Sequence, residues 1–156
     1  MVEVRKLLEY NEKIRHRYFE AIAKLSWEEF VENREASFHS FRNIFLHTLG
    51  AIDYWLDFLK KEKSSYRKSD EYNTFQDVSA RMEYIEKRMR DYLNSLQEDG
   101  LREKYTVTND ANETIEVTAE DVLIHVFEEE VHHRGEIIAL LWQMGVEPPL
   151  MGWKDL

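Results

Sequence analysis

The stretch TAEDVLIHVFEEEVHHRGEIIALLWQM, residues 118–144, has the pattern of one long α-helix. Thr118 and the acidic residue three positions later are typical of a helix N-cap, and Gly145 follows the last apolar turn. Between these ends, apolar residues recur near the helical period at Val122, Val126, Ile137 and Leu140. An amphipathic helix of this length must bury its apolar stripe, so the stretch predicts packing against other helices.

Three further segments show the same period, and only five glycines and two prolines interrupt the 156 residues. We predict helices over residues 4–25, from about residue 37 to the lysine run at 60–63, and over residues 74–96. A break follows the first helix at Ser26, where Ser-Trp-Glu-Glu resembles an N-cap and first turn. Four helices with mostly short connections predict an antiparallel bundle.

One stretch departs from the helical period. Residues 104–108 and 114–118 alternate β-branched side chains around a polar turn, which predicts a short β-hairpin or extended segment before the last helix. The predicted fold class is therefore all-α, a four-helix bundle with this one insertion. We expect a single domain over residues 1–156.

The composition excludes several classes of function. With 31 acidic and 21 basic residues the net charge is −10, which argues against nucleic acid as a partner. The absence of cysteine excludes disulfides, a thiolate nucleophile and thiolate zinc ligands, so any metal must be held by imidazole and carboxylate groups. No apolar run approaches the roughly 18 residues that cross a bilayer, and no signal-peptide core is visible. We expect a cytoplasmic protein that does not bind membranes.

Two polar residues interrupt the apolar stripe of the last helix. Glu129 and His133 are one turn apart on the same face, where a carboxylate and an imidazole are costly unless they are paired or bind a metal. Both interpretations, a metal-free pair and two metal ligands, stand at this point. His47 lies beside the apolar stripe of the 37–60 helix and is a candidate third ligand. Two histidines and one carboxylate would leave coordination positions open, as in catalytic sites.

Three short pieces of the sequence resemble the DinB/YfiT-like superfamily, small four-helix bundles with a three-histidine metal site. They are residues 47–56 (HTLGAIDYWL), 125–137 (HVFEEEVHHRGEI) and 144–149 (MGVEPP). In that family the second piece reads His-x3-His-x3-His-Arg-Gly. His125 and the His133-Arg-Gly sequence match this pattern, whereas Glu129 stands where the family usually has its middle histidine.

The resemblance implies an up-down-down-up, DinB-like bundle that forms a homodimer and holds one divalent metal ion, zinc or nickel first and iron or manganese next. The implied ligands are His47, Glu129 and His133. His125 is an alternative ligand or a neighbour of the site, and Arg134 and Tyr54 are candidates to lie around it. The three other histidines, His16, His39 and His132, have no inward partner in the sequence pattern and are expected at the surface.

Relatives of this kind imply a metal-dependent enzyme that transfers a low-molecular-weight thiol, such as bacillithiol or mycothiol, to an electrophilic small molecule. The metal would lower the pKa of the bound thiol. An alternative from another class is a non-catalytic dimeric bundle, stress-associated or ligand-binding, in which Glu129 and His133 form a buried pair. An iron-dependent oxygenase is suggested only by the ligand set.

Overall fold

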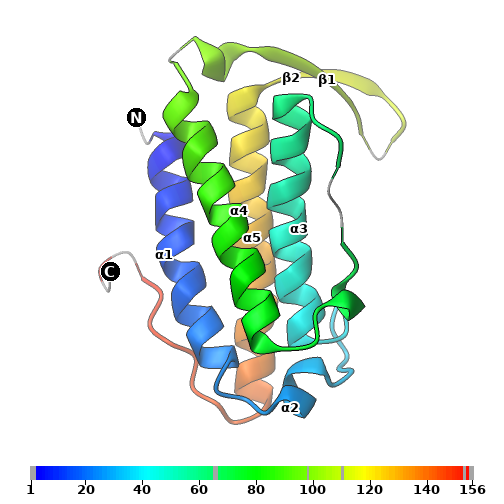
Figure 1. Ribbon diagram of the computed structural model, residues 1–156, viewed down its shortest axis with the longest axis vertical. Helices are drawn as coiled ribbons and strands as arrows, with labels where there is room; N and C mark the ends of the chain where they lie inside the picture. Colours follow the sequence, from blue (N-terminus) through cyan, green and yellow to red (C-terminus); the bar gives the residue numbers. More distant parts are fainter. Residues whose placement is uncertain (1–2, 65–66, 98, 110, 153, 155–156) are drawn as a thin grey trace.

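The computed structural model describes residues 3–64, 67–97, 99–109, 111–152 and 154. Its helices and strands are α1 (Val4–Ile22), α2 (Trp27–Val31), α3 (Phe41–Lys60), α4 (Phe75–Ser95), β1 (Lys104–Thr108), β2 (Thr114–Thr118) and α5 (Ala119–Gln143), with 3-10 turns at Ser69–Glu71 and Gly100–Arg102. The four long helices stand side by side, with the β-hairpin across one end of the bundle and α2 at the other (Figure 1).

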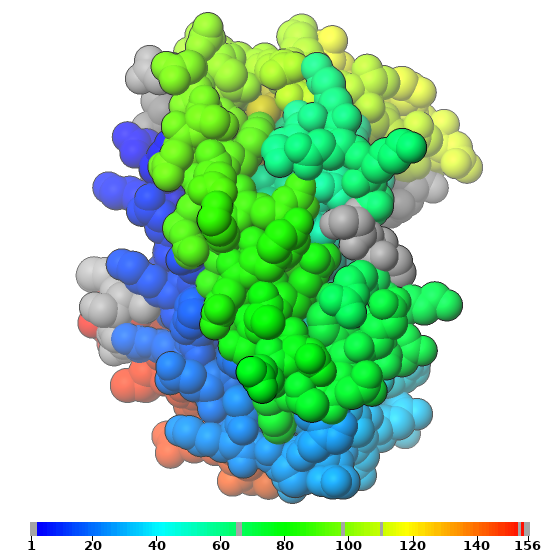
Figure 2. All heavy atoms as spheres, in the orientation of Figure 1, coloured from blue at the N-terminus to red at the C-terminus, as the bar shows by residue number. Residues whose placement is uncertain are grey.

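The directions of the long helices define the topology of the bundle. α1 and α5 run one way and α3 and α4 the other, as the colour gradient in Figure 1 shows. This confirms the predicted up-down-down-up order, which requires the connection from α3 to α4 to return along the length of the bundle. α5 packs against both α1 and α3, and α4 packs against α3. In the space-filling view, α4 covers much of the visible face (Figure 2).

Hydroxyl groups mark the starts of the three later long helices. The side chains of Ser40, Thr74 and Thr118 each accept a hydrogen bond from the backbone N–H three residues further on. Such caps satisfy N–H groups that have no partner within the first helical turn. The caps at Thr74 and Thr118 agree with the predicted helix boundaries.

The start of α3 corrects the sequence-based boundary near Ser37. The helix begins only at Phe41, because Ser40 forms the cap and His39 has a φ of 68°. A non-glycine residue in this left-handed region cannot continue a right-handed helix. Ser37 and Phe38 therefore belong to the connection before α3.

The break after α1 contains the very short helix α2. α1 ends at Ile22 rather than near Leu25. Ser26 caps α2 and accepts a hydrogen bond from the Glu29 N–H, while the Glu29 carboxylate accepts one from the Ser26 N–H. The Ser-Trp-Glu-Glu sequence is thus a helix cap and first turn, as predicted.

The β-hairpin is a two-stranded antiparallel sheet in which Lys104 pairs with Thr118 and Thr108 with Thr114. The Asn109 side chain accepts hydrogen bonds from two backbone N–H groups of the turn that follows it. Tyr105 is buried and donates a hydrogen bond to the Leu59 carbonyl (3.1 Å), which fixes the hairpin to the end of α3.

The core lies between the inward faces of the four long helices. Between α1 and α3 it is aromatic, since Phe19 stacks on Phe45 with ring centroids 4.9 Å apart and Tyr18 meets Phe45 edge-on at 5.7 Å. Burying each such side chain stabilises the fold by roughly 1.5–3 kcal/mol. Within the described ranges, no helix is long and apolar enough to span a membrane.

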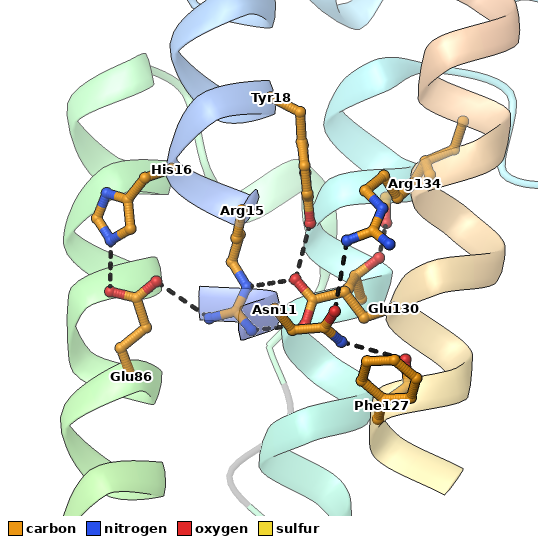
Figure 3. A network of polar contacts seen from close by, with 10 residues as sticks. Asn11, Arg15, His16, Tyr18, Glu86, Phe127, Glu130 and Arg134 are labelled. Atoms are coloured by element: carbon orange, nitrogen blue, oxygen red, sulfur yellow. Dashed lines mark hydrogen bonds and ion pairs between the residues drawn. The ribbon is translucent and has the colours of Figure 1, made fainter. Parts of the chain in front are cut away.

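A charged network crosses the core between α1, α4 and α5 (Figure 3). Arg15 is buried and donates two hydrogen bonds of 2.7 Å to Glu130 and one of 3.0 Å to Glu86. Tyr18 donates a further hydrogen bond to Glu130 (3.0 Å). Burial disfavours the charged form of Arg15, but the attraction of Glu130, together with that of Tyr18 and Glu86, outweighs burial and raises the pKa of Arg15. Helical spacing alone places Glu130 at the edge of the apolar stripe of α5.

A second network joins α4 to α3. Arg88 donates hydrogen bonds to Asp53 and Asp57, and Arg81 lies 2.6 Å from Asp53. Both aspartates are buried, so their charges are compensated where water cannot solvate them.

We expect Arg15→Met to destabilise the protein by about 3–5 kcal/mol, because the change leaves Glu130 buried without its cation and removes the Arg15 contact of Glu86. Urea unfolding followed by circular dichroism measures this. Arg90→Met is the matched control, since the Arg90–Glu12 pair is exposed at the Arg90 end and should contribute less than about 1 kcal/mol. Equal losses in the two variants would contradict a special role for the buried pair.

Candidate metal centre

Two of the three predicted ligands face α3 from the middle of α5. His133 is almost completely buried, whereas Glu129 is partly exposed (8% and 28% of the side chain). Their i, i+4 spacing stacks the side chains one turn apart, and the His133 Nε2 atom lies 3.4 Å from the Glu129 Oε2 atom. Of the two side chains, Glu129 is therefore the one that is accessible to solvent.

His47 completes the cluster from α3. Its ring lies 4.7 Å from that of His133, and its Nε2 atom is 3.9 Å from the Glu129 Oε2 atom. One ligand atom from each of the three side chains lies within 4.8 Å of the others. Ligands bound to one zinc-sized ion at about 2.0–2.2 Å would lie slightly closer together. The donor set therefore fits a divalent ion after small side-chain movements.

The connection before α3 holds both histidines in place. Phe38 stacks on the His47 ring, with centroids 3.9 Å apart and planes within 19°. Ser37 donates a hydrogen bond to the Glu136 Oε2 atom (2.7 Å), and the same oxygen lies 3.1 Å from the His133 Nδ1 atom. One histidine is thus held by stacking and the other by a hydrogen-bonded carboxylate.

The pKa values of His47 and Glu136 are both shifted from their ordinary values in directions that suit a metal site. Burial, and secondarily the nearby His133, lower the pKa of His47, which favours the neutral ring that a metal needs. Partial burial opposes the ionisation of Glu136, but hydrogen bonds from Ser37 and His133 outweigh it and lower the pKa of Glu136.

A cavity of about 1000 Å³ opens beside the cluster. It is bounded by α3, α5 and the β-hairpin, and His47 and Glu129 are part of its wall. Tyr54, Trp55 and His125 also line it. The His125 Nε2 atom is 4.0 Å from the Glu129 Oε1 atom, so it faces the carboxylate oxygen opposite to the one beside His133. His125 lies outside the three-residue cluster but next to it.

The structure directs Arg134 to another part of the molecule. Its guanidinium donates a hydrogen bond to Asn11 on α1 (3.4 Å) and lies over the Tyr10 ring. Figure 3 shows Arg134 on the α1 side of α5, beside the Arg15–Glu130 network. Its contacts there are structural.

The remaining histidines are scattered. His16, His39 and His132 are exposed, as expected. His16, also expected to lack an inward partner, has one in Glu86, with its Nε2 atom 3.0 Å from the carboxylate. The sequence did not indicate this contact because Glu86 belongs to α4, which is distant along the chain.

The sequence matches the profile of the DinB family over residues 1–155. The chain belongs to the DinB family. The solved structure of a DinB-like protein from Bacillus subtilis has a similar fold, with a TM-score of 0.67, 17% identity, and coverage of 94% of this chain and 97% of that one. A conserved protein from Enterococcus faecalis gives a TM-score of 0.68 at 14% identity, covering 89% of this chain and 95% of that one. No curated protein matched the sequence.

Within this DinB bundle, the groups around the ligands are what sequence reasoning missed. Glu136 follows His133 by three residues on the same helix, a spacing that could have marked it as a partner. Ser37 and Phe38 carried no such signal, because a helix start near residue 37 does not indicate that either side chain reaches the site.

Proposed function

We propose that this DinB-family protein is a divalent-metal-dependent enzyme that transfers a low-molecular-weight thiol to an electrophilic small molecule. The proposal rests on the convergence of two imidazoles and one carboxylate beside a large cavity, whose wall includes His47 and Glu129. Three protein ligands leave further coordination positions for a substrate, as catalytic metal sites require.

His47, Glu129 and His133 would hold the ion, with zinc or nickel the first expectation and iron or manganese the next. A bound divalent ion would lower the pKa of a coordinating thiol and so supply a thiolate at neutral pH. Glu129 would act as a ligand, and a carboxylate engaged in this way is not a free general base.

The chain's own residues would bind and orient the reactants. Because the protein has no cysteine, the thiol has to come from outside, and the cavity is large enough for both reactants. Tyr54 and Trp55 offer aromatic surface to the electrophile. The thiol sulfur would bond to the electrophilic carbon, the leaving group would depart with the bonding electrons, and the thiol proton would pass to solvent. We place this reaction in the cytoplasm, where such thiols are kept reduced.

A second candidate function is favoured by one contact. Glu129 and His133 are already 3.4 Å apart and can pair without a metal, as they would in a non-catalytic ligand-binding bundle. Measuring whether the protein binds a metal distinguishes the metal-dependent enzyme from the non-catalytic bundle.

We expect the protein, purified without a histidine tag, to bind about one zinc or nickel ion per chain in calorimetry and elemental analysis. His133→Ala and Glu129→Ala should each weaken binding by more than about 100-fold, because a direct ligand matters more than an outer partner. Glu129→His should retain binding. His16→Ala and Glu128→Ala are the controls, since one lies on α1 and the other is exposed on α5. No binding of zinc, nickel, iron or manganese would leave the non-catalytic alternative.

The cavity itself can be tested through Gly50, which lines it on α3 and where an added side-chain carbon would meet no atom within 4 Å. Gly50→Phe should fill the cavity, leave the metal stoichiometry unchanged and abolish the conjugation of thiols to chlorodinitrobenzene, followed by absorbance. Gly135→Phe, at an exposed site on α5 with equal space, should retain this activity. A metal-loaded protein that is inactive with every thiol would reject the transferase and keep the metal site.

We also propose that the protein is a homodimer. Ile124, Val131 and Trp142 are exposed on α5, and their spacings of seven and eleven residues are close to two and three full turns. Apolar side chains exposed along one helix face are typical of protein interfaces. Sedimentation velocity should give the mass of a dimer, and Val131→Arg should yield a monomer, whereas Tyr84→Arg on α4 should not. A monomeric unaltered chain would exclude the dimer.

A further inference from the structure

Glu136 occupies a specific place relative to the candidate metal ligand His133. Its Oε2 atom is 3.1 Å from the Nδ1 atom of the imidazole. The other ring nitrogen, Nε2, faces Glu129 (3.4 Å) and belongs to the cluster that includes His47. The carboxylates of Glu129 and Glu136 therefore lie at opposite edges of the buried His133 ring.

In a neutral imidazole, the position of the single proton decides which ring nitrogen can bind a metal. Such a ring carries one proton, on Nδ1 or on Nε2, and only the nitrogen without the proton can bind a metal. An ionised carboxylate can only accept hydrogen bonds, so Glu136 favours the tautomer with the proton on Nδ1. The Nε2 lone pair then points into the cluster.

Glu129 competes for the same ring, because it could accept a proton carried on Nε2. Its distance of 3.4 Å is longer than the 3.1 Å of the Glu136 contact. The Glu129 carboxylate also faces His47 and His125 at 3.9 and 4.0 Å. Glu136 makes the shorter contact, so the Nδ1 proton should prevail.

Ser37 fixes the carboxylate in turn. Its hydroxyl donates a 2.7 Å hydrogen bond to the same Oε2 atom that faces His133. Because this oxygen accepts from Ser37, the carboxylate is held in the position from which it faces the His133 Nδ1 atom. The neighbouring residue Phe38 stacks on His47, so two consecutive residues hold both histidines.

We infer that Glu136 is a positioning residue, held by Ser37, which fixes the His133 tautomer that presents Nε2 to the metal. The inference rests on the proposed metal site for its functional meaning, whereas the tautomer itself is a property of the metal-free protein. Metal-ligating histidines are oriented in this way by outer carboxylates, whose loss weakens metal binding by about 10- to 100-fold.

Long-range proton–nitrogen NMR of the metal-free protein at pH 8 reads the tautomer directly. His133 should carry its proton on Nδ1 in the unaltered chain and in Glu136→Gln, whose amide oxygen can still accept. In Glu136→Ala the proton should move mainly to Nε2. A proton on Nε2 in the unaltered chain, or an unchanged tautomer in Glu136→Ala, would overturn the inference. Circular dichroism of each variant verifies that it is folded.

Metal affinity supplies the second readout. By calorimetry with zinc, Glu136→Ala should bind about 10- to 100-fold more weakly and Glu136→Gln less so, while Glu128→Ala, on the exposed face of α5, should match the unaltered chain. If Glu136→Ala loses no affinity, Glu136 does not position the ligand. If no variant binds zinc but the tautomer depends on Glu136, the metal proposal fails and the hydrogen-bond assignment stands.

Discussion

Arg15 donates two hydrogen bonds to Glu130 inside the bundle, and this buried ion pair fixes the rotation of α5 against α1. Successive residues of a helix are about 100° apart, so a Glu130 directed at α1 turns the neighbouring Glu129 toward α3. A rotated α5 would leave Arg15 and Glu130 uncompensated in the core, which is far more costly than a lost surface pair. The charged pair thus specifies which face of α5 carries the candidate metal ligands.

The opposite side of the site depends on where α3 begins. His39 adopts a positive φ and Ser40 caps the helix, so Ser37 and Phe38 lie outside α3, with Phe38 against His47 and Ser37 against Glu136. From this connection Ser37 donates a hydrogen bond to Glu136 on α5. A local backbone feature therefore supports a contact between segments that are nearly one hundred residues apart.

Much of the fold could be predicted because the spacing of apolar residues along a helix shows which of its faces is buried. The apolar period located the four long helices, and alternation located the hairpin, since both arise from repeating backbone geometry. The same period placed Glu129 and His133 on one face. The period does not predict that Glu130 is buried, because a stripe averaged over many residues does not show that a cation from α1 will pair with one carboxylate. Glu136 was not predicted to be part of the site for a similar reason, because its second partner, Ser37, lies on a different segment.

The sequence by itself determined the four long helices, the cap at Thr118, the placement of Glu129 and His133 on one face of α5 and the lack of any thiol ligand. These features follow from local hydrogen bonding, helical spacing and composition. Only the tertiary structure decided that His47 meets α5 at this level, that Arg15 fills the space beside Glu130, and that Ser37 reaches Glu136. Such contacts depend on how rigid helices are rotated and shifted against one another, which side-chain packing across the whole core determines.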